Sequence, residues 1–220
     1  MAETIAAPLK GKVAIVTGGS RGIGRAITEV FAKQGATHIA TTYVSNKQKA
    51  EDVLSAIRKE FPSIKTHAIH ADVLDTNFGS VVVDAALKGL GVDHIDIAVA
   101  NAAPVEDLST WPGVENLSWE FWNNQITGLA WNTISLSTAV IKHMPPGGRI
   151  IMMSSTASKM PWGDPCVPYS AGKAAMEAAS KQLAVIYQPK GVTVNTISVG
   201  PTRTDAWGAG KKLDPEWEEQ

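Results

Sequence analysis

Short apolar runs alternate along this chain with longer segments in which apolar residues recur every three or four positions. The short runs predict buried strands, because they are rich in aliphatic and β-branched residues; they cover residues 12–17, 38–43, 65–71, 95–100, 149–154 and 192–197. The longer segments predict amphipathic helices; they cover residues 22–33, 46–61, 75–90, 118–143 and 169–187. We expect loops over 104–116 and 155–168, and little regular structure after residue 198.

Strands and helices therefore alternate through the chain, without an internal repeat or a low-complexity linker. This order predicts a parallel sheet with right-handed crossovers and helices on both faces. We expect a single domain over residues 1–220, with an α/β doubly wound fold of Rossmann type in three layers. Asp75 is expected to cap the third helix, and the Pro-Pro-Gly-Gly sequence at 145–148 to end the fourth.

A glycine-rich turn separates the first strand from the first helix and reads Thr-Gly-Gly-Ser-Arg-Gly-Ile-Gly at 17–24. Glycines let the backbone approach a pyrophosphate, which the helix N-terminus then faces with free N–H groups. The spacing of Gly18, Gly22 and Gly24 differs from the commoner G-x-G-x-x-G pattern, and no Gly-Lys-Ser/Thr follows, which excludes a P-loop. Taken alone, the motif also fits a strand-to-helix turn that binds nothing.

Ligands of doubly wound sheets bind beyond the carboxyl ends of the strands. Five candidate positions follow predicted strands and therefore belong to that edge of the sheet: Gly18, Asp72, Asn101, Ser155 and Gly200. We expect them to line one binding cleft.

Tyr169 and Lys173 carry the candidate chemistry. They lie four residues apart at the start of a predicted helix, so both side chains share one face. An ammonium close to a phenol favours the phenolate and lowers its pKa from about 10, so Tyr169 could exchange a proton with a carbonyl or alcohol oxygen. Ser155, 14 positions earlier, could hydrogen-bond the same oxygen. An amphipathic pair and a capping serine are the plain alternatives.

Together these segments resemble the short-chain dehydrogenase/reductase family, in its shorter form, over about residues 9–205. The marks of the resemblance are the glycine-rich turn, Asp72-Val73, Asn101-Ala102-Ala103, Ser154-Ser155, Tyr169-Ser-Ala-Gly-Lys173 and Val194-Asn195 through Thr204. Jointly they are highly specific.

The resemblance implies that Ser155 positions a carbonyl, that Tyr169 moves a proton, and that Lys173 holds the nicotinamide ribose. It also implies that Asp72 binds the adenine edge and Asn101 the adenosine-side ribose. Thr202 and Thr204 would contact the nicotinamide amide or a phosphate. The full set of implied cofactor contacts is Gly18, Ser20, Arg21, Gly22, Ile23, Gly24, Tyr43, Ser45, Asp72, Val73, Asn101, Ala102, Tyr169, Lys173, Gly200, Thr202 and Thr204.

The chain departs from the family pattern at several positions. Gln125 stands where the family usually has an asparagine thought to hold a water in a proton relay, so Gln125 is a weak catalytic candidate. Asn124 cannot replace it, because neighbouring residues are turned by about 100° on a helix. Ala103 stands in place of Gly and Val199 in place of Pro. The family also adds a last strand and helix after the point where this sequence ends.

The loop before Tyr169 is one residue longer than the family's, and Asp164 and Trp162 within it could face a substrate. Trp162, Trp111 and Trp207 all belong to loops that flank the expected cleft. These tryptophans favour an apolar substrate, with an aromatic one as the narrower option.

The sequence favours NADP(H) over NAD(H). A site for NAD has a carboxylate about 20 residues past the glycines, whereas residues 36–50 contain no Asp or Glu. Arg21 in the glycine turn can pair with a 2′-phosphate, and Ser45, Asn46 and Lys47 can donate hydrogen bonds to it. The alternative for Arg21 is a solvated loop residue.

Composition narrows the remaining classes. Hydrophobic residues are 44% and charged residues 19%, and the net charge of −1 gives no indication of nucleic acid or an anionic membrane as a partner. No apolar run is long enough to span a membrane, and the start lacks a signal-peptide pattern. Cys166 is the single cysteine, so we expect a reducing, cytoplasmic location. His67 and His70 would point to opposite faces of a strand, so no metal site is expected.

We therefore expect an NADPH-dependent oxidoreductase that reduces a carbonyl, or oxidises the corresponding alcohol, of an apolar small molecule. A cyclase, isomerase or dehydratase that keeps the cofactor pocket is the leading alternative, and a non-catalytic nucleotide sensor is the third. We expect a homodimer or homotetramer packed through the helices at 118–143 and 169–187.

Overall fold

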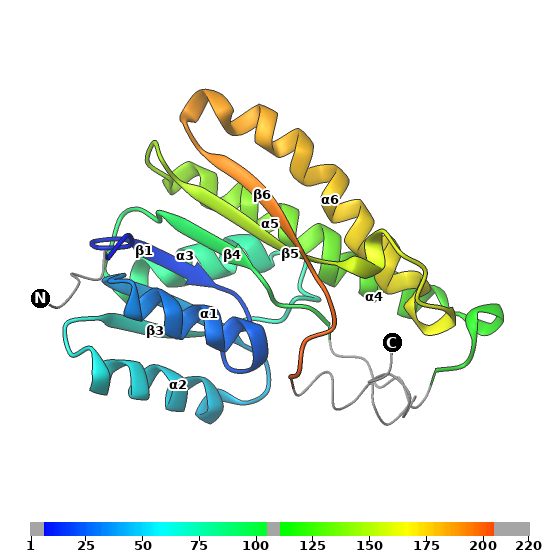
Figure 1. The fold of residues 1–220 in the computed structure, drawn as a ribbon, viewed down its shortest axis with the longest axis horizontal. Coiled ribbons are helices and arrows are strands. Elements are labelled where there is room, and N and C mark those ends of the chain that lie inside the picture. The colour runs from blue at the N-terminus through cyan, green and yellow to red at the C-terminus, as the bar shows by residue number, and fades with distance from the viewer. Residues whose placement is uncertain (1–6, 105–110, 205–220) are drawn as a thin grey trace, which may run out of the picture.

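The computed structural model describes residues 7–104 and 111–204. Within these ranges six strands form one sheet, all parallel, in the order β3-β2-β1-β4-β5-β6 (Figure 1). The strands are β1 (Val13–Val16), β2 (His38–Tyr43), β3 (Lys65–His70), β4 (Ile97–Ala100), β5 (Arg149–Ser155) and β6 (Thr193–Val199). The strand order reverses between β1 and β4, the position at which doubly wound folds bind ligands. The predicted fold class is confirmed.

Helices cover both faces of the sheet and make the three expected layers. In Figure 1, α1 and α2 lie in front of the sheet and α3 and α5 behind it, with α6 beside β6. The helices are α1 (Gly22–Lys33), α2 (Lys47–Glu60), α3 (Phe78–Leu90), α4 (Trp119–Ile126), α5 (Asn132–Val140) and α6 (Val167–Tyr187). Shorter helical turns are η2 (Val114–Asn116), η3 (Thr127–Trp131), η4 (Ile141–His143), η5 (Thr156–Ser158), η6 (Asp164–Cys166) and η7 (Gln188–Lys190).

The prediction of one continuous α-helix over residues 118–143 is wrong, because the middle of this segment is not α-helical. A π-helical segment, η3, separates α4 from α5. Within it Gly128 lies against Pro104, and a Cβ on Gly128 would lie 2.1 Å from Pro104 Cγ. A π segment changes the turn without ending the helix, so the apolar spacing continues across it and the sequence pattern does not reveal it.

The prediction that Asp75 caps the third helix is also wrong. Asn77 is the N-cap and α3 begins at Phe78. Asp75 instead accepts a hydrogen bond from the backbone N–H of Asn77 at 2.8 Å, so its carboxylate stabilises the turn before the helix.

Other predicted boundaries differ by one or two residues. The helix α6 begins at Val167 instead of Tyr169, because Pro168 fits the first turn of a helix, where its missing N–H has no partner to lose. The strand β6 extends to Val199, which pairs with Ser155 of β5. Pairing with β5 therefore continues the strand beyond residue 197, where the apolar pattern of the sequence ends.

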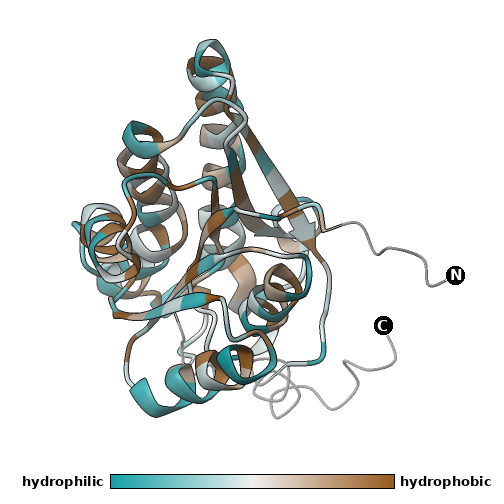
Figure 2. Ribbon diagram, turned by 90° about the vertical axis from the view of Figure 1, so that its left-hand side faces the viewer, coloured by the Kyte–Doolittle hydropathy of each residue, from teal (hydrophilic) through white to brown (hydrophobic). Residues whose placement is uncertain are grey.

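The core is densest behind the sheet, where α3, α5 and α6 pack on Ile15, Ile150 and Met152. On the other face, α1 and α2 cover the β1–β3 side, whereas Ile197 on β6 remains 50% exposed. Figure 2 shows that the surface helices carry both hydrophilic and hydrophobic residues along their length, as amphipathic helices do. In the described ranges, no helix is both long and apolar enough to cross a lipid bilayer.

Candidate active site

The glycine-rich turn packs so closely on its neighbours that it has no room for side chains at two positions. A Cβ on Gly24 would lie 2.3 Å from the carbonyl oxygen of Gly18, and one on Gly19 would lie 2.1 Å from Thr41 Oγ1. Gly18 and Gly22 have positive φ angles of 69° and 53°, which glycine adopts without steric cost. The turn therefore brings the N-terminus of α1 against the carboxyl end of β1.

Threonine hydroxyls on β2 hold this turn in place. Thr42 Oγ1 accepts a hydrogen bond from the N–H of Gly18 at 2.9 Å, and Thr41 Oγ1 accepts one from the N–H of Gly19 at 2.8 Å. Both threonines are buried. Their role was not predicted from the sequence, because a threonine in a strand is ordinarily explained by β-propensity alone.

Asn101 and Asp72 lie just beyond the ends of β4 and β3, as expected. Asn101 Nδ2 donates to the carbonyl oxygen of Thr17 at 2.9 Å, and the N–H groups of Asn101 and Ala102 donate to Thr17 Oγ1 at 2.9 and 3.0 Å. Asp72 Oδ1 accepts from the N–H of Leu74 at 2.9 Å. Both side chains thus shape the cleft edge through local hydrogen bonds.

The end of β2 is polar and carries no carboxylate. Tyr43 packs against His70 with ring centroids 5.5 Å apart. Ser45 is exposed, and Asn46 is the N-cap of α2, where its side chain accepts a backbone hydrogen bond. Arg21 is exposed at the N-cap position of α1, and its side chain makes no capping hydrogen bond.

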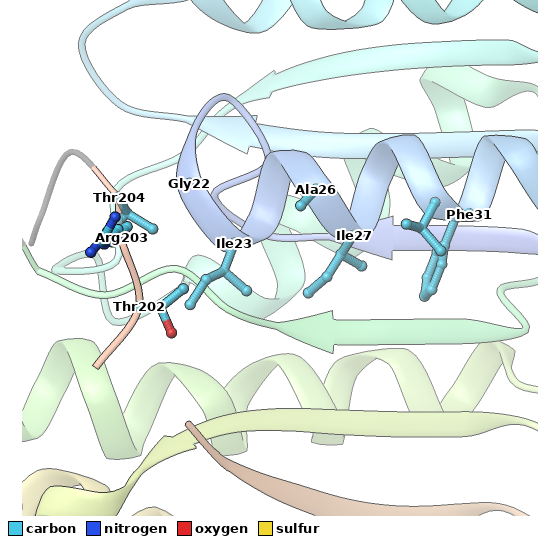
Figure 3. Close-up of a pocket in the computed structure, with 9 residues that line it drawn as sticks. Gly22, Ile23, Ala26, Ile27, Phe31, Thr202, Arg203 and Thr204 are labelled. Atoms are coloured by element: carbon cyan, nitrogen blue, oxygen red, sulfur yellow. The ribbon is translucent and has the colours of Figure 1, made fainter. Parts of the chain in front are cut away.

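Residues 202–204 return to the glycine-rich turn. Figure 3 shows Thr202, Arg203 and Thr204 beside Gly22 and Ile23. A Cβ on Gly22 would lie 3.4 Å from Thr204 Cγ2. With one side of α1 these residues line an open groove of about 380 Å³. The structure therefore places Thr202 and Thr204 next to the turn.

Ser155, Tyr169 and Lys173 meet beyond the end of β5. Ser155 is the last residue of β5 and Tyr169 lies in the first turn of α6, and the two side chains are close enough for the Ser155 hydroxyl to act on the pKa of the Tyr169 phenol. Lys173 Nζ lies 5.7 Å from the centroid of the Tyr169 ring. The loop between β5 and α6 thus brings residues of two successive elements into one group.

Burial dominates the electrostatics of this group. Lys173 is 5% exposed, and burial lowers its pKa from 10.5 to about 8, opposed by the charge of Glu177. Burial also raises the pKa of Tyr169, against the hydrogen bond with Ser155, which lowers it. The expected lowering of the pKa of Tyr169 by Lys173 is not found. Desolvation favours the neutral phenol, and the ammonium is engaged by the carbonyl oxygen of Met153 at 2.5 Å.

Gln125 is buried in α4, close to the same group. A Cβ on Gly172 would lie 3.3 Å from the backbone oxygen of Gln125 and 2.9 Å from Leu129 Cδ1. Gly172 therefore allows α4 and η3 to pack on α6 immediately beside Lys173. The sequence analysis did not single out Gly172, although its place within the Tyr169–Lys173 motif was the available signal.

Asp164 links two of the loops that flank the cleft. Its Oδ2 accepts from Trp111 Nε1 at 2.9 Å and its Oδ1 from the N–H of Val114 at 2.9 Å. Trp111 in turn packs edge-on against Phe121. Both oxygens of Asp164 therefore serve the loop contact. Trp207 lies outside the described residues.

Residues 7–104 and 111–204 contain no cluster of three or more His, Cys, Asp or Glu side chains that could hold a metal ion.

Comparison with protein families agrees with this geometry. The family model for short chain dehydrogenases matches residues 12–213. The chain therefore belongs to the short chain dehydrogenase family and is an oxidoreductase of the short-chain dehydrogenase/reductase type.

Individual relatives share most of the chain. It is 42% identical over 210 residues to short chain dehydrogenase penD of Penicillium thymicola, covering 94% of this chain and 75% of the relative. It is 32% identical over 201 residues to hydroxynaphthalene reductase-like protein Arp2 of Metarhizium robertsii, covering 91% and 72%. A short chain dehydrogenase from Burkholderia cenocepacia, solved in complex with NADP, superposes with a TM-score of 0.81 at 33% identity, covering 90% of this chain and 77% of that one.

Proposed function

We propose that this chain is an NADPH-dependent oxidoreductase that reduces a carbonyl of an apolar small molecule, or oxidises the corresponding alcohol. The observation that carries the proposal is the convergence of Ser155, Tyr169 and the buried Lys173, whose Nζ lies 5.7 Å from the centroid of the Tyr169 ring. A phenol and a hydroxyl that converge on one point can both bind the oxygen of a carbonyl.

The glycine-rich turn fits a dinucleotide. Its cradle has no space for a Cβ at Gly24, and the first turn of α1 contains no acidic residue. The N–H groups at that helix end suit a pyrophosphate. Gly18, Gly22 and residues 202–204 would hold the phosphates, while Asp72 and Asn101 would hold the adenosine side. When bound, the dinucleotide supplies the hydride.

The chain's own residues would manage the proton. In the direction of reduction, Ser155 and Tyr169 donate hydrogen bonds to the substrate oxygen, and Tyr169 transfers its proton as that oxygen becomes an alcohol. This proton transfer leaves a buried, negatively charged phenolate, which the ammonium of Lys173 would stabilise. In the resting structure the raised pKa of Tyr169, caused by burial, keeps the phenol protonated and ready to donate.

Arg21 supports NADPH as the preferred form. It is the exposed N-cap of α1, and residues 36–50 offer no carboxylate that would repel a 2′-phosphate. The relative from Burkholderia cenocepacia was solved with NADP. The name of the Metarhizium relative, hydroxynaphthalene reductase-like, supports an aromatic substrate. Trp162, which lines a hollow with Ser158, Cys166 and Ser170, supports it as well.

One observation favours a second candidate. Because burial keeps Tyr169 as a phenol, it could also serve as a general acid in a cyclisation, isomerisation or dehydration that moves no hydride. Gln125 in place of the family's asparagine points the same way.

Turnover separates the two candidates. The purified chain is incubated with NADPH and a panel of apolar and aromatic ketones, and the NADPH absorbance is followed. Ketone-dependent oxidation of NADPH supports the reductase. Products that form equally with and without NADPH support the second candidate. If neither result is seen, the remaining candidate is a non-catalytic nucleotide-binding protein.

We further propose a homodimer or homotetramer. Trp119 on α4 is 76% exposed, and Val185 and Ile186 on α6 are 70% and 62% exposed. Large exposed apolar side chains on two helices mark a candidate subunit contact. Sedimentation at micromolar concentration tests this, and a monomer alone would contradict it.

A further inference from the structure

A carboxylate that the sequence analysis overlooked lies behind the proposed catalytic group. Glu177 follows Lys173 by one turn of α6 and Tyr169 by two turns, so the three side chains share one helix face. The side chain of Glu177 is only 14% exposed. A carboxylate this enclosed requires hydrogen-bond partners to remain ionised.

Three serine hydroxyls from separate segments donate to Oε1 of Glu177. The donors are Ser154 in β5 at 2.5 Å, Ser158 in η5 at 2.8 Å and Ser198 in β6 at 3.0 Å. Lys159 Nζ lies 3.9 Å from the other oxygen and donates to Ser198 Oγ at 2.7 Å. Burial raises the pKa of Glu177, but the hydrogen bonds from the serines outweigh it and hold the pKa below its ordinary value. The carboxylate is therefore charged at neutral pH.

These contacts belong to a larger pattern between β5 and α6. Three consecutive residues of β5 meet one face of α6. The carbonyl oxygen of Met153 accepts from Lys173 Nζ, and Ser154 Oγ donates to Glu177. Ser155 lies close enough to Tyr169 to act on its pKa. Ser158 Oγ also lies 2.6 Å from the carbonyl oxygen of Ser155, so its single proton is shared between that oxygen and Glu177. The segment that carries Ser155 is thus fixed to α6 on both sides of Ser155.

We propose that Glu177 is a positioning residue for the reaction: it holds the ends of β5, η5 and β6 against α6, and it keeps a negative charge one turn from Lys173. This role rests on the proposed function, because the residue acts through Ser154, Ser155 and Lys173. It does not itself reach the Ser155–Tyr169 contact.

The charge of Glu177 has a measurable consequence at Lys173. Tyr169 and Glu177 on α6 are the titratable groups next to Lys173. Beyond them, Cys166 in η6 acts on Tyr169, and Lys159 after η5 lies 3.9 Å from Glu177. Among them Glu177 is the group whose charge favours the ammonium of Lys173. Removing that charge lets Lys173 lose its proton at lower pH.

The test compares Glu177→Gln and Glu177→Ala with the parent. Glu60→Gln is the matched control, because Glu60 is an exposed carboxylate at the end of α2. The titration of Lys173 is followed by NMR in protein carrying isotope-labelled lysine, with the signal assigned by its loss in Lys173→Met. The kcat and KM for NADPH-dependent ketone reduction are measured over the same pH range.

We expect Glu177→Gln to move the Lys173 titration, and the alkaline fall of kcat, to lower pH. Glu177→Ala should in addition lower kcat by about tenfold or more, because Ser155 is no longer held in place, whereas Glu60→Gln should match the parent. An unmoved Lys173 titration together with parental kcat in both Glu177 variants overturns the proposal. If Glu177→Ala does not fold, the Lys173 titration and the kcat of Glu177→Gln alone test the proposal. Glu177→Gln should fold, because its amide oxygen can still accept hydrogen bonds from the serines.

The titration needs no substrate, so the two proposals fail in different ways. A parent that reduces no ketone refutes the reductase, while the NMR shift still reports whether Glu177 acts on Lys173. A parent that reduces ketones with an unmoved titration and unchanged kcat in the variants refutes the role of Glu177 alone.

Discussion

The nucleotide side and the chemistry side of the cleft are built by different means. At the β1–α1 end, the site is made of backbone: Gly24 touches the carbonyl of Gly18, and the threonines of β2 bind turn N–H groups. At the β5–α6 end, side chains make the site, through the contacts of Tyr169, Lys173 and Glu177 with β5.

This difference predicts opposite sensitivities. The backbone-built side has no space, so it should be damaged by added atoms. The side-chain-built side depends on particular protons and charges in a buried place, so it should be damaged by their removal.

Tyr169→Phe removes one hydroxyl from the chemistry side. We expect kcat for ketone reduction to fall by about 10²–10⁴-fold, the usual contribution of a positioned general acid, with NADPH affinity nearly unchanged in a calorimetric titration. Tyr187→Phe on the same helix is the matched control and should keep parental activity, because Tyr187 is buried in the core. A Tyr169→Phe variant with near-parental turnover would remove the phenol from the mechanism.

Lys173→Met removes the buried charge. We expect kcat/KM to fall by roughly 10²-fold, because the phenolate loses its cation, and NADPH to bind more weakly, since the ribose loses a donor. Unchanged NADPH affinity would reject the ribose contact, and an unchanged pH–rate profile would reject the role in proton transfer.

The same variant tests the burial of Lys173 through stability. Its folded-state pKa of about 8 lies below the ordinary 10.5, so between these values the unfolded chain binds a proton that the folded chain does not. The contribution of Lys173 to the free energy of unfolding therefore rises with pH between about 8 and 10.5. Urea titrations of the parent and Lys173→Met should show this rise as a difference between the two proteins, and parallel curves would contradict it.

Gly24→Ala adds one methyl group to the nucleotide side. Its Cβ would lie 2.3 Å from the carbonyl oxygen of Gly18 and 2.5 Å from Asn101 Nδ2, so the turn must move. We expect a loss of about 1–3 kcal/mol of stability and a clear loss of NADPH affinity. Gly147→Ala is the control, because that glycine has open space and a positive φ of 89°; it should lose stability only and keep NADPH affinity. Normal NADPH binding by Gly24→Ala would show that the turn tolerates added atoms.

Arg21→Ala should have the smallest effect, because an exposed ion pair is screened by solvent. We expect NADPH affinity to fall by up to about fivefold, NADH affinity to stay the same, and added salt to reduce the difference. Arg25→Ala, which removes an exposed arginine paired with Glu29 one turn further along α1, is the control. Equal affinity of the parent for NADPH and NADH would refute the proposed preference.

Much of the fold followed from local patterns in the sequence. The strands at 38–43 and 65–70 and the helix at 22–33 were predicted within a residue, because their apolar spacing and flanking glycines act over a few positions. The predicted 118–143 helix was not continuous, because the π segment η3 preserves the apolar spacing while changing the backbone. Asp75 was wrongly predicted to be the N-cap of the third helix. The helix begins three residues later, at Phe78, and the Asp75 side chain instead accepts a hydrogen bond from the N–H of Asn77.

The chemical groups that this protein carries, and the elements on which they lie, follow from the amino-acid sequence alone. Tyr169, Lys173 and Glu177 must lie on one face of a helix because of the helical repeat, and the glycines must form a turn because of their backbone freedom. Only the tertiary structure decided what surrounds those groups. It buried Lys173 and Tyr169, moved their pKa values against the local expectation and brought Ser154, Ser158 and Ser198 to one carboxylate. Desolvation and hydrogen-bond partners depend on segments distant in the chain, and no local pattern encodes them.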